Sequence, residues 1–145
     1  MHQVMSEAIT TYRLTRDTAR LLENIAEEVF DAELDPQRLA SYLESPGHLM
    51  IIAACEKQVV GQVAAYVHRH PDQAPDLYID NLGVAPPFQR RGVARRLVDE
   101  VLAWGKTLEC HQAWIVTDTE NNGARALYEG AGAPAEPIVM FSYKL

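Results

Sequence analysis

The stretch VAPPFQRRGVA, residues 84–94, decides the fold of this 145-residue chain, because it joins the end of an apolar strand to a basic turn and a long helix. Pro86 and Pro87 prevent the strand from continuing, and Gly92 lets a ligand approach the backbone without meeting a Cβ atom. The first backbone N–H groups of a helix lack intrahelical partners, and the helix dipole is positive there. We therefore expect residues 89–95 to bind an anion, in particular a diphosphate.

Taken alone, this turn also fits a solvated basic loop at the start of an ordinary helix. The flanking segments are therefore needed to choose between the two interpretations. Upstream, LYIDNLGV (residues 77–84) predicts a buried strand. Downstream, AWIVTDTENNGARALYEG (residues 113–130) predicts a strand, a polar loop and a second helix. The order βαβα is typical of an α/β domain.

The unit from Leu77 to Ala133 resembles the core of the GNAT superfamily of acyl-CoA-dependent N-acetyltransferases. The first signature of that family is Val-x-Pro-x-x-(Gln/Arg)-x-x-Gly-x-(Gly/Ala), and the residues that fill it here are Val84, Pro86, Gln89, Gly92 and Ala94. The second signature, Asn-x-x-Ala-x-x-Leu-Tyr followed by a glycine, is filled by Asn121, Ala124, Leu127, Tyr128 and Gly132. Two independent matches at the right separation argue against chance.

The rest of the chain extends this pattern. The elements predicted outside the unit are a strand at Ala8–Leu14, helices at Thr15–Phe30 and Asp35–Glu44, a hairpin of Leu49–Cys55 and Val59–Val67, and a last strand at Val139–Tyr143. The resemblance then implies an α/β (α+β) GNAT fold, with a mixed central sheet of about six to seven strands flanked by about four helices. A length of 145 residues with 48% hydrophobic residues predicts a single domain over residues 1–145.

Composition narrows the classes of partner. The chain has 13 basic and 20 acidic residues. Its net charge of −7 argues against a nucleic-acid-binding surface and is compatible with a small cationic acceptor. Cys55 and Cys110 show no metal-ligand or redox spacing, which indicates reduced thiols in a cytoplasmic protein. No apolar run reaches transmembrane length and the start lacks the pattern of a signal peptide, so we expect neither membrane association nor export.

The resemblance implies acetyl-CoA as the co-substrate. Its diphosphate would meet the backbone N–H groups from Arg90 to Arg95, and its pantetheine arm would pair like an extra strand with the backbone of Leu82 and Val84. The full set expected to contact acetyl-CoA is Leu82, Gly83, Val84, Gln89, Arg90, Arg91, Gly92, Val93, Ala94, Arg95, Asn121 and Tyr128.

By the same resemblance, Tyr128 is the general acid that protonates the leaving sulfur. The structural alternative is a half-buried aromatic ring that packs beside Leu127. Asn121 either caps the last helix with its side chain or contacts the pantetheine arm, and the two roles are compatible.

The general base is where the sequence departs from the family. Relatives often place a glutamate at the positions that are Asn81 and Val116 here, so the candidate base is the neighbouring Asp80, assisted by ordered water. The alternative is that Asp80 is structural or holds the substrate. In a regular strand Asp80 and Asn81 point to opposite faces, so only one reaches the acceptor amine unless a bulge intervenes. Asp80, Asn81 and Asp118 are the candidate substrate residues, although Asp118 also fits simple turn stabilisation.

His68 and His70 are two residues apart, but no carboxylate or cysteine completes a metal set at a recognisable spacing, so the sequence predicts no metal site. The acidic residues that would hold a cationic acceptor near the cleft are Asp31, Glu33, Asp35, Asp72 and Asp76, although each also fits ordinary solvated surface.

Three functions remain open. The first is acetyl transfer to a primary amine of a small cationic acceptor, because residues 61–98 look most like the aminoglycoside 3-N-acetyltransferase branch. In that branch, however, a carboxylate occupies the position of Asn81. The second is acetylation of a protein N-terminus or lysine, and the third is a non-catalytic acyl-CoA-binding module. A homodimer through Ile138–Tyr143 is also open, since relatives often pair in this way.

Overall fold

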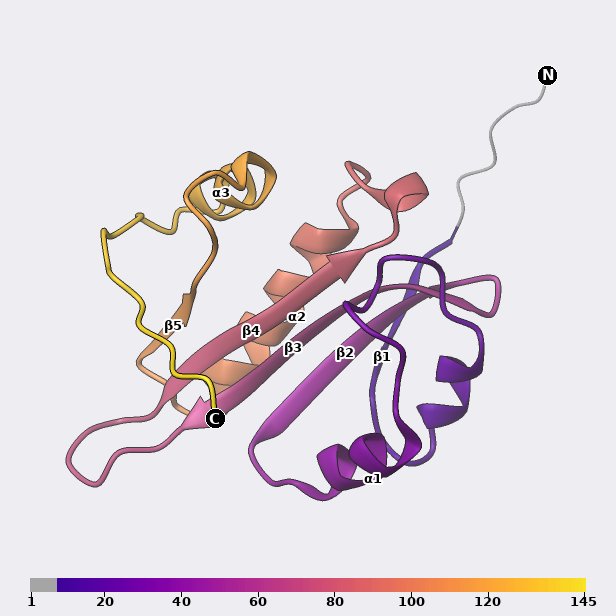
Figure 1. The fold of residues 1–145 in the computed structure, drawn as a ribbon, viewed down its shortest axis with the longest axis horizontal. Helices are drawn as coiled ribbons and strands as arrows, with labels where there is room; N and C mark the ends of the chain where they lie inside the picture. Colours follow the sequence, from indigo (N-terminus) through magenta and orange to yellow (C-terminus); the bar gives the residue numbers. More distant parts are fainter. Residues whose placement is uncertain (1–7) are drawn as a thin grey trace. The chain divides into compact units, whose positions relative to one another are not determined.

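The computed structural model describes residues 8–145, which form two compact units. The first unit ends at Ile115 and contains a five-stranded sheet in the order β1-β2-β3-β4-β5 (Figure 1). The second unit, Val116–Leu145, contains one helix, α3. The single domain expected over residues 1–145 stays a prediction.

The elements follow the predicted order with fewer members. The strands are β1 (Thr10–Arg13), β2 (His48–Cys55), β3 (Gln58–His68), β4 (Asp76–Val84) and β5 (Gln112–Ile115). The α-helices are α1 (Pro36–Glu44), α2 (Val93–Thr107) and α3 (Asn122–Gly130), and the short 3₁₀ helices are η1 (Ala19–Glu23) and η2 (Pro86–Phe88). The predicted mixed α/β fold is confirmed, but residues 8–145 hold five strands and three α-helices instead of the larger numbers expected.

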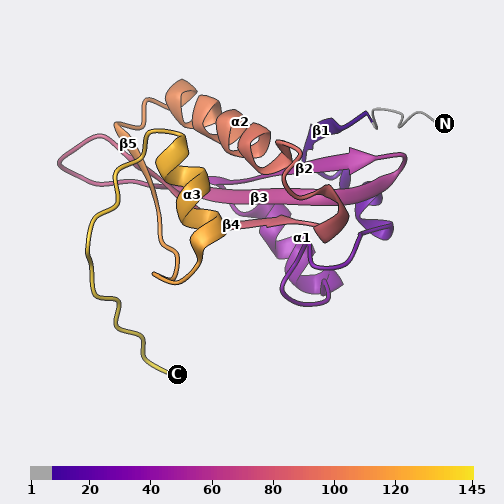
Figure 2. The same ribbon diagram turned by 90° about the horizontal axis from the view of Figure 1, so that it is seen from above.

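Helices lie on both faces of the sheet in the first unit. Strands β1 to β4 pair antiparallel, whereas β5 pairs parallel with β4. Figure 2 shows α2 above the sheet and α1 below it, and we call these the α2 face and the α1 face. The buried residues of α2 are Val93, Leu97, Val98, Val101 and Gly105. Part of the core therefore lies between α2 and the sheet, and Leu22 and Val29 belong to the same cluster.

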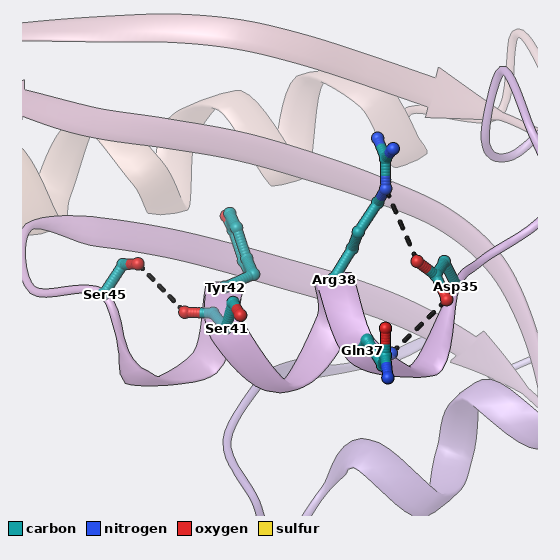
Figure 3. A pocket seen from close by; sticks show the side chains of 6 residues that line it. All are labelled: Asp35, Gln37, Arg38, Ser41, Tyr42 and Ser45. Carbon is teal, nitrogen blue, oxygen red and sulfur yellow. Dashed lines mark hydrogen bonds and ion pairs between the residues drawn. The ribbon is translucent and has the colours of Figure 1, made fainter.

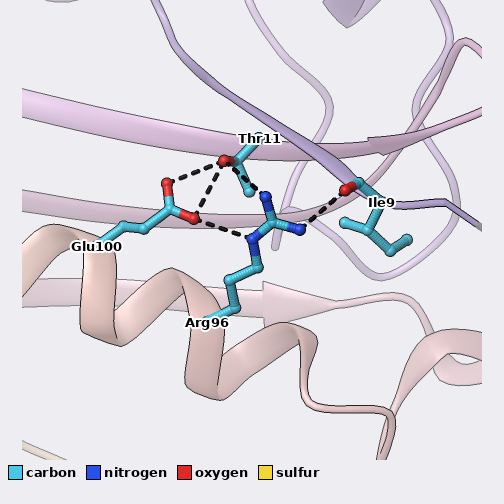
Figure 4. Close-up of polar contacts among 4 residues, drawn as sticks. All are labelled: Ile9, Thr11, Arg96 and Glu100. Atoms are coloured by element: carbon cyan, nitrogen blue, oxygen red, sulfur yellow. Dashed lines mark hydrogen bonds and ion pairs between the residues drawn. The ribbon is translucent and has the colours of Figure 1, made fainter.

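A polar cluster joins α2 to the first strand (Figure 4). Arg96 donates to the carbonyl oxygen of Ile9 at 2.8 Å and pairs with Glu100 at 3.1 Å. The hydroxyl of Thr11 donates to Glu100 at 2.9 Å. These contacts fix the position of α2 against β1. The turn that contains Gly92 directly precedes α2.

The predicted helix over Thr15–Phe30 is wrong, since this stretch contains only the short η1. The cause is long-range pairing with the start of β3. Asn24 accepts a bond from the Val59 N–H at 2.8 Å, Ala26 donates to the Val59 carbonyl at 2.9 Å, and Ile25 bridges to Val59. Extended pairing of these residues excludes a helix there, so tertiary contacts override local propensity.

The predicted strand over Val139–Tyr143 is also wrong, because this segment has no regular secondary structure. No strand among residues 8–145 pairs with it. A strand without a neighbour has no ladder of hydrogen bonds to stabilise it. The apolar side chains of Ile138, Val139, Met140, Phe141 and Tyr143 are exposed. In the described part of the chain, no helix is both long and apolar enough to span a membrane.

Gly83 provides a test of how β4 packs. A Cβ atom there would overlap the carbonyl oxygen of Val29, a backbone atom of a buried residue. We expect Gly83→Ala to lower the free energy of unfolding by about 1–3 kcal/mol in urea titrations. The control is Gly130→Ala, where the added Cβ meets no atom within 4 Å, and the change should stay within about 1 kcal/mol. Equal stability of the two variants would contradict the close approach of Val29.

Candidate active site

A β-bulge lies in the middle of β4. Ile79 pairs with Ala65 of β3, whereas Asn81 pairs with the adjacent Ala64. Asp80 is therefore an extra residue without a partner in the ladder. A bulge of this kind interrupts the alternation of side chains along a strand.

The bulge places the side chains of Asp80 and Asn81 on the same face of the sheet. The amide of Gln62 donates to Asn81 Oδ1 at 2.6 Å and to the Val29 carbonyl at 3.1 Å, and Asn81 donates to Asp31 Oδ2 at 3.3 Å. Asp80 interacts with His48 and with the tyrosines beside it, on the α1 face. The sequence analysis allowed for a bulge at this point, and the structure contains one. Whether Asp80 and Asn81 contact the acceptor stays a prediction.

Asp80 is exposed at the edge of an aromatic row. The row runs along the α1 face, with ring centroids 5.2 Å apart for Tyr42 and His48, 5.8 Å for His48 and Tyr66, and 5.2 Å for Tyr66 and Tyr78. Burial raises the pKa of Asp80, and a backbone hydrogen bond together with the charge of the nearby His48 partly offsets that rise. Burial, together with the charge of Asp80, raises the pKa of Tyr42 to about 12. The carboxylate of Asp80 is thus a stronger base than an ordinary aspartate.

One edge of β4 lacks a strand partner over its second half. Strand β5 pairs with β4 only from Asp76 to Ile79, and within residues 8–145 no other strand pairs with this edge from Asp80 to Val84. Backbone groups along such an edge can pair with an extended ligand. This is where the sequence predicted the pantetheine arm, at Leu82 and Val84.

The turn after β4 holds the start of α2 open. Gln89 donates from its side chain to the Val84 carbonyl at 2.9 Å, which closes the turn on the strand. Arg90 and Gly92 have positive φ angles of 63° and 82°. A Cβ on Gly92 would meet nothing within 4 Å, and the N–H of Arg96 bonds to the Gly92 carbonyl at 3.0 Å. The N–H groups of Val93 to Arg95 come before this first intrahelical bond, so they have no carbonyl partner within the helix.

Some residues that are expected to contact the cofactor can offer it only their backbone groups. Val84 and Val93 are buried in the core, so they offer backbone groups alone. Arg95 pairs with Asp99 at 3.2 Å, and the guanidinium of Arg91 lies 5.3 Å from the centre of the Phe88 ring. Backbone N–H groups and the helix dipole, with exposed arginines around them, would therefore hold an anion here.

The second unit carries the remaining predicted residues on and before α3. Asn121 Oδ1 accepts from the Ala124 N–H at 3.0 Å, so the predicted cap is confirmed. Tyr128 is half-buried, and desolvation raises the pKa of its hydroxyl, which therefore remains protonated at neutral pH. Asp118 is exposed and its carbonyl accepts from the Asn121 N–H at 3.0 Å, a turn that suits the structural alternative for Asp118.

An open groove lies beside α1 (Figure 3). Its lining residues are Asp35, Gln37, Arg38, Ser41, Tyr42 and Ser45. Asp35 caps α1 through the Gln37 N–H at 3.4 Å and pairs with Arg38 at 3.4 Å. Tyr42 lines this groove and is also close enough to Asp80 for the charge of that residue to raise its pKa.

Residues 11–133 of this chain match the acetyltransferase (GNAT) family. The chain belongs to that family. The resemblance that the two signatures indicated is confirmed, and the match covers most of the chain rather than the unit from Leu77 to Ala133 alone. The unpaired edge of β4 and the turn at Gly92 both lie within the residues that match the GNAT family.

Among curated relatives, an aminoglycoside N(6')-acetyltransferase type 1 of Salmonella typhimurium (strain LT2) is 29% identical over 73 residues, which is 50% of this GNAT chain and 50% of that protein. The matched region therefore spans about half the length of the relative. Its name gives the 6' position, whereas the sequence resemblance was to the 3-N branch. Both names refer to aminoglycoside acetyltransferases.

Solved structures share the fold over nearly the whole GNAT chain. An aminoglycoside acetyltransferase from an uncultured soil metagenomic sample has a TM-score of 0.83 at 23% identity, covering 95% of this chain and 99% of its own. The aminoglycoside N-acetyltransferase AAC(6')-Iy, solved in complex with CoA, has a TM-score of 0.80 at 20% identity, covering 97% of both chains. At such identities the likeness shows the fold.

One contact of this GNAT site had no signal in the sequence. Asp31 lies 50 residues from Asn81 in the chain, yet its carboxylate is 3.3 Å from the Asn81 amide. A carboxylate thus lies beside the position where relatives carry glutamate.

Asp76 is not available to an acceptor, because it is buried and accepts hydrogen bonds from His70 and His111 at the start of β4. Its expected role near the cleft is wrong.

The environment of Asp80 predicts how its proton affinity responds to substitution. His48→Ala should raise the pKa of Asp80 further, because it removes the charge that partly offsets desolvation. The pKa can be followed by the ¹³C shift of the carboxyl carbon in an NMR pH titration. His111→Ala serves as the control, since this histidine contacts Asp76 instead and should leave Asp80 unchanged. A pKa of Asp80 that stays put or falls in His48→Ala would contradict this arrangement.

Proposed function

We propose that this chain is an acetyl-CoA-dependent N-acetyltransferase that moves the acetyl group to a primary amine of a small cationic acceptor, such as an aminoglycoside, in a ternary complex. The observation that carries the proposal is the junction of β4 and α2. There the unpaired edge of β4 leads to the start of α2, where Gly92 leaves space at the backbone. The bulge presents Asp80 on the α1 face of the sheet.

The residues at this junction suit acetyl-CoA in two ways. The edge from Asp80 to Val84 offers backbone hydrogen bonds to an extended amide-containing arm. The start of α2, with Gly92 leaving room at the backbone, suits a diphosphate. Bound acetyl-CoA supplies the activated acetyl group.

The acceptor side of the proposal rests on charge. Asp80 is exposed on the α1 face, and Asp31 is held next to Asn81 on the same face. Carboxylates on one face favour an acceptor that carries several ammonium groups, as an aminoglycoside does. The names of the similar proteins, which include aminoglycoside acetyltransferases, agree with this choice.

In the proposed reaction the amine nitrogen attacks the acetyl carbonyl carbon, the C–N bond forms and the C–S bond breaks. Asp80, directly or through water, accepts the proton that the ammonium must lose, and its raised pKa brings it closer to this task. A backbone N–H near Leu82 to Val84 stabilises the charge on the carbonyl oxygen. Tyr128 donates its proton to the departing thiolate, which leaves as the CoA thiol, and the second proton lost by the nitrogen passes through water to restore the Tyr128 hydroxyl.

The experiment that tests this function is measurement of CoA thiol release from acetyl-CoA across aminoglycosides, polyamines, amino acids and short peptides. We expect release that depends on a polycationic amine. Release with peptides alone would indicate the protein-acetylating alternative. Binding of acetyl-CoA without release for any amine would indicate a non-catalytic acyl-CoA-binding module, and either outcome would overturn the proposal.

Asp80→Asn tests the base. We expect turnover to fall by about 100-fold or more, because general base catalysis contributes that much. In the native protein, activity should fall as the pH drops through the pKa of Asp80, at a pH above the usual aspartate range, and Asp80→Asn should lack this limb. Asp17→Asn, the same change at an exposed site, should keep the native profile.

The Asp80→Asn variant should remain folded at neutral pH. Because the folded-state pKa of Asp80 is raised, ionisation of the native residue disfavours folding as the pH rises through that pKa, and asparagine removes this cost. A low rate in a well-folded variant is therefore a catalytic effect. An unchanged rate and pH profile would contradict the role of Asp80 as base.

Tyr128→Phe tests the general acid. We expect turnover to fall by about 10- to 1000-fold, with the Kd for acetyl-CoA nearly unchanged, since only the proton donor is removed. Tyr12→Phe, the same change on an exposed ring of β1, should have no effect. Equal losses of binding and turnover in Tyr128→Phe would contradict the assignment.

A further inference from the structure

A second group of chemically reactive side chains lies at the other end of β4. His68 ends β3, Asp76 begins β4, and the two residues are partners in the β3–β4 ladder. His70 lies in the connecting loop, with its ring centroid 4.4 Å from that of His68. We call His68, His70 and Asp76 the His-Asp cluster. None of these residues belongs to the proposed acetyl-transfer site.

The distances within the His-Asp cluster suit a metal ion. One ligand atom from each of the three residues lies within 4.8 Å of the others. His70 Nε2 is 3.3 Å from Asp76 Oδ2. Two ligands of a tetrahedral Zn²⁺, each about 2.0–2.1 Å from the ion, lie about 3.3 Å apart. This pair is therefore already separated as two zinc ligands would be.

The carboxylate of Asp76 is oriented by groups outside the cluster. Its Oδ1 atom is 2.6 Å from His111 Nε2 and 3.4 Å from the Gln112 amide, which holds Oδ2 toward His70. Metal-ligating carboxylates are commonly held by such outer hydrogen bonds. Asp76 is also 8% exposed, so its orientation is fixed within the sheet. These contacts distinguish it from a solvated surface acid.

We propose that the His-Asp cluster binds Zn²⁺ through His68, His70 and Asp76, with water in the fourth position. Two imidazoles and one carboxylate are ligands that zinc accepts in sites with three protein ligands. Ion binding would tie the loop of residues 69–75 to the ladder at its two ends. The inference does not depend on acetyl transfer, because the cluster lies at the start of β4 and none of its residues belongs to the proposed acetyl-transfer site.

The sequence prediction of no metal site came from spacing alone. His68 and His70 were visible as a pair, but the carboxylate lies beyond a loop, and His111 comes from a more distant segment. Antiparallel pairing of β3 with β4 brings Asp76 back beside the pair. The site is a product of the fold rather than of a local motif.

The test is isothermal titration of ZnCl₂ into the chelator-treated full chain at pH 7.5. We expect saturable binding of one Zn²⁺ per chain. His68→Ala and His70→Ala should each weaken the affinity by about tenfold or more. His48→Ala, which removes an exposed histidine from β2 outside the cluster, should bind as the native chain does.

Thermal unfolding gives a second readout that does not depend on activity. Zn²⁺ should raise the Tm of the native chain and of His48→Ala, but not that of His68→Ala, because only a site in the folded state stabilises it. His68 is exposed, so its replacement by alanine leaves the fold intact. Absence of saturable binding, or equal affinity in His68→Ala and the native chain, would overturn the proposal.

Discussion

The bulge at Asp80 determines which side chains this GNAT domain presents beside the unpaired edge of β4. In an uninterrupted β4, alternation would send Asp80 and Asn81 to opposite faces. One extra residue opposite Ala64 and Ala65 brings both to the α1 face. There Asn81 joins Gln62 and Asp31, and Asp80 joins the aromatic row. The chemistry of the face thus depends on a single local irregularity in the ladder.

The segment after η1 supports this arrangement. The buried side chain of Gln62 donates both to Asn81 and to the carbonyl of Val29, while its own Oε1 has no hydrogen-bond partner among the described residues. The same Val29 carbonyl lies where a Cβ of Gly83 would be. A glycine on the strand and a buried amide therefore allow a chain segment to lie directly on β4. That close approach is what places Asp31 beside Asn81.

Sequence patterns were sufficient wherever the controlling contacts are local. The hairpin around Glu56–Gln58, the helix that begins after Gly92 and the Asn121 cap all follow from residues close together in the chain. The failures are long-range. Pairing of Asn24 and Ala26 with Val59 replaced a predicted helix, and Val139–Tyr143 lacks the neighbour that a strand requires. Asp31 and Asp76 acquired their partners only through the sheet, so neither contact was visible in spacing.

The central claim is that acetyl-CoA occupies the unpaired edge of β4 and the open start of α2. The most direct measurement is an NMR titration of the ¹⁵N-labelled chain with CoA, followed at the backbone amides. The account predicts that the largest shift changes fall at two groups, Leu82–Val84 and Gly92–Arg95, and saturate together. Saturable binding that leaves both groups of amides unmoved while others shift would contradict it.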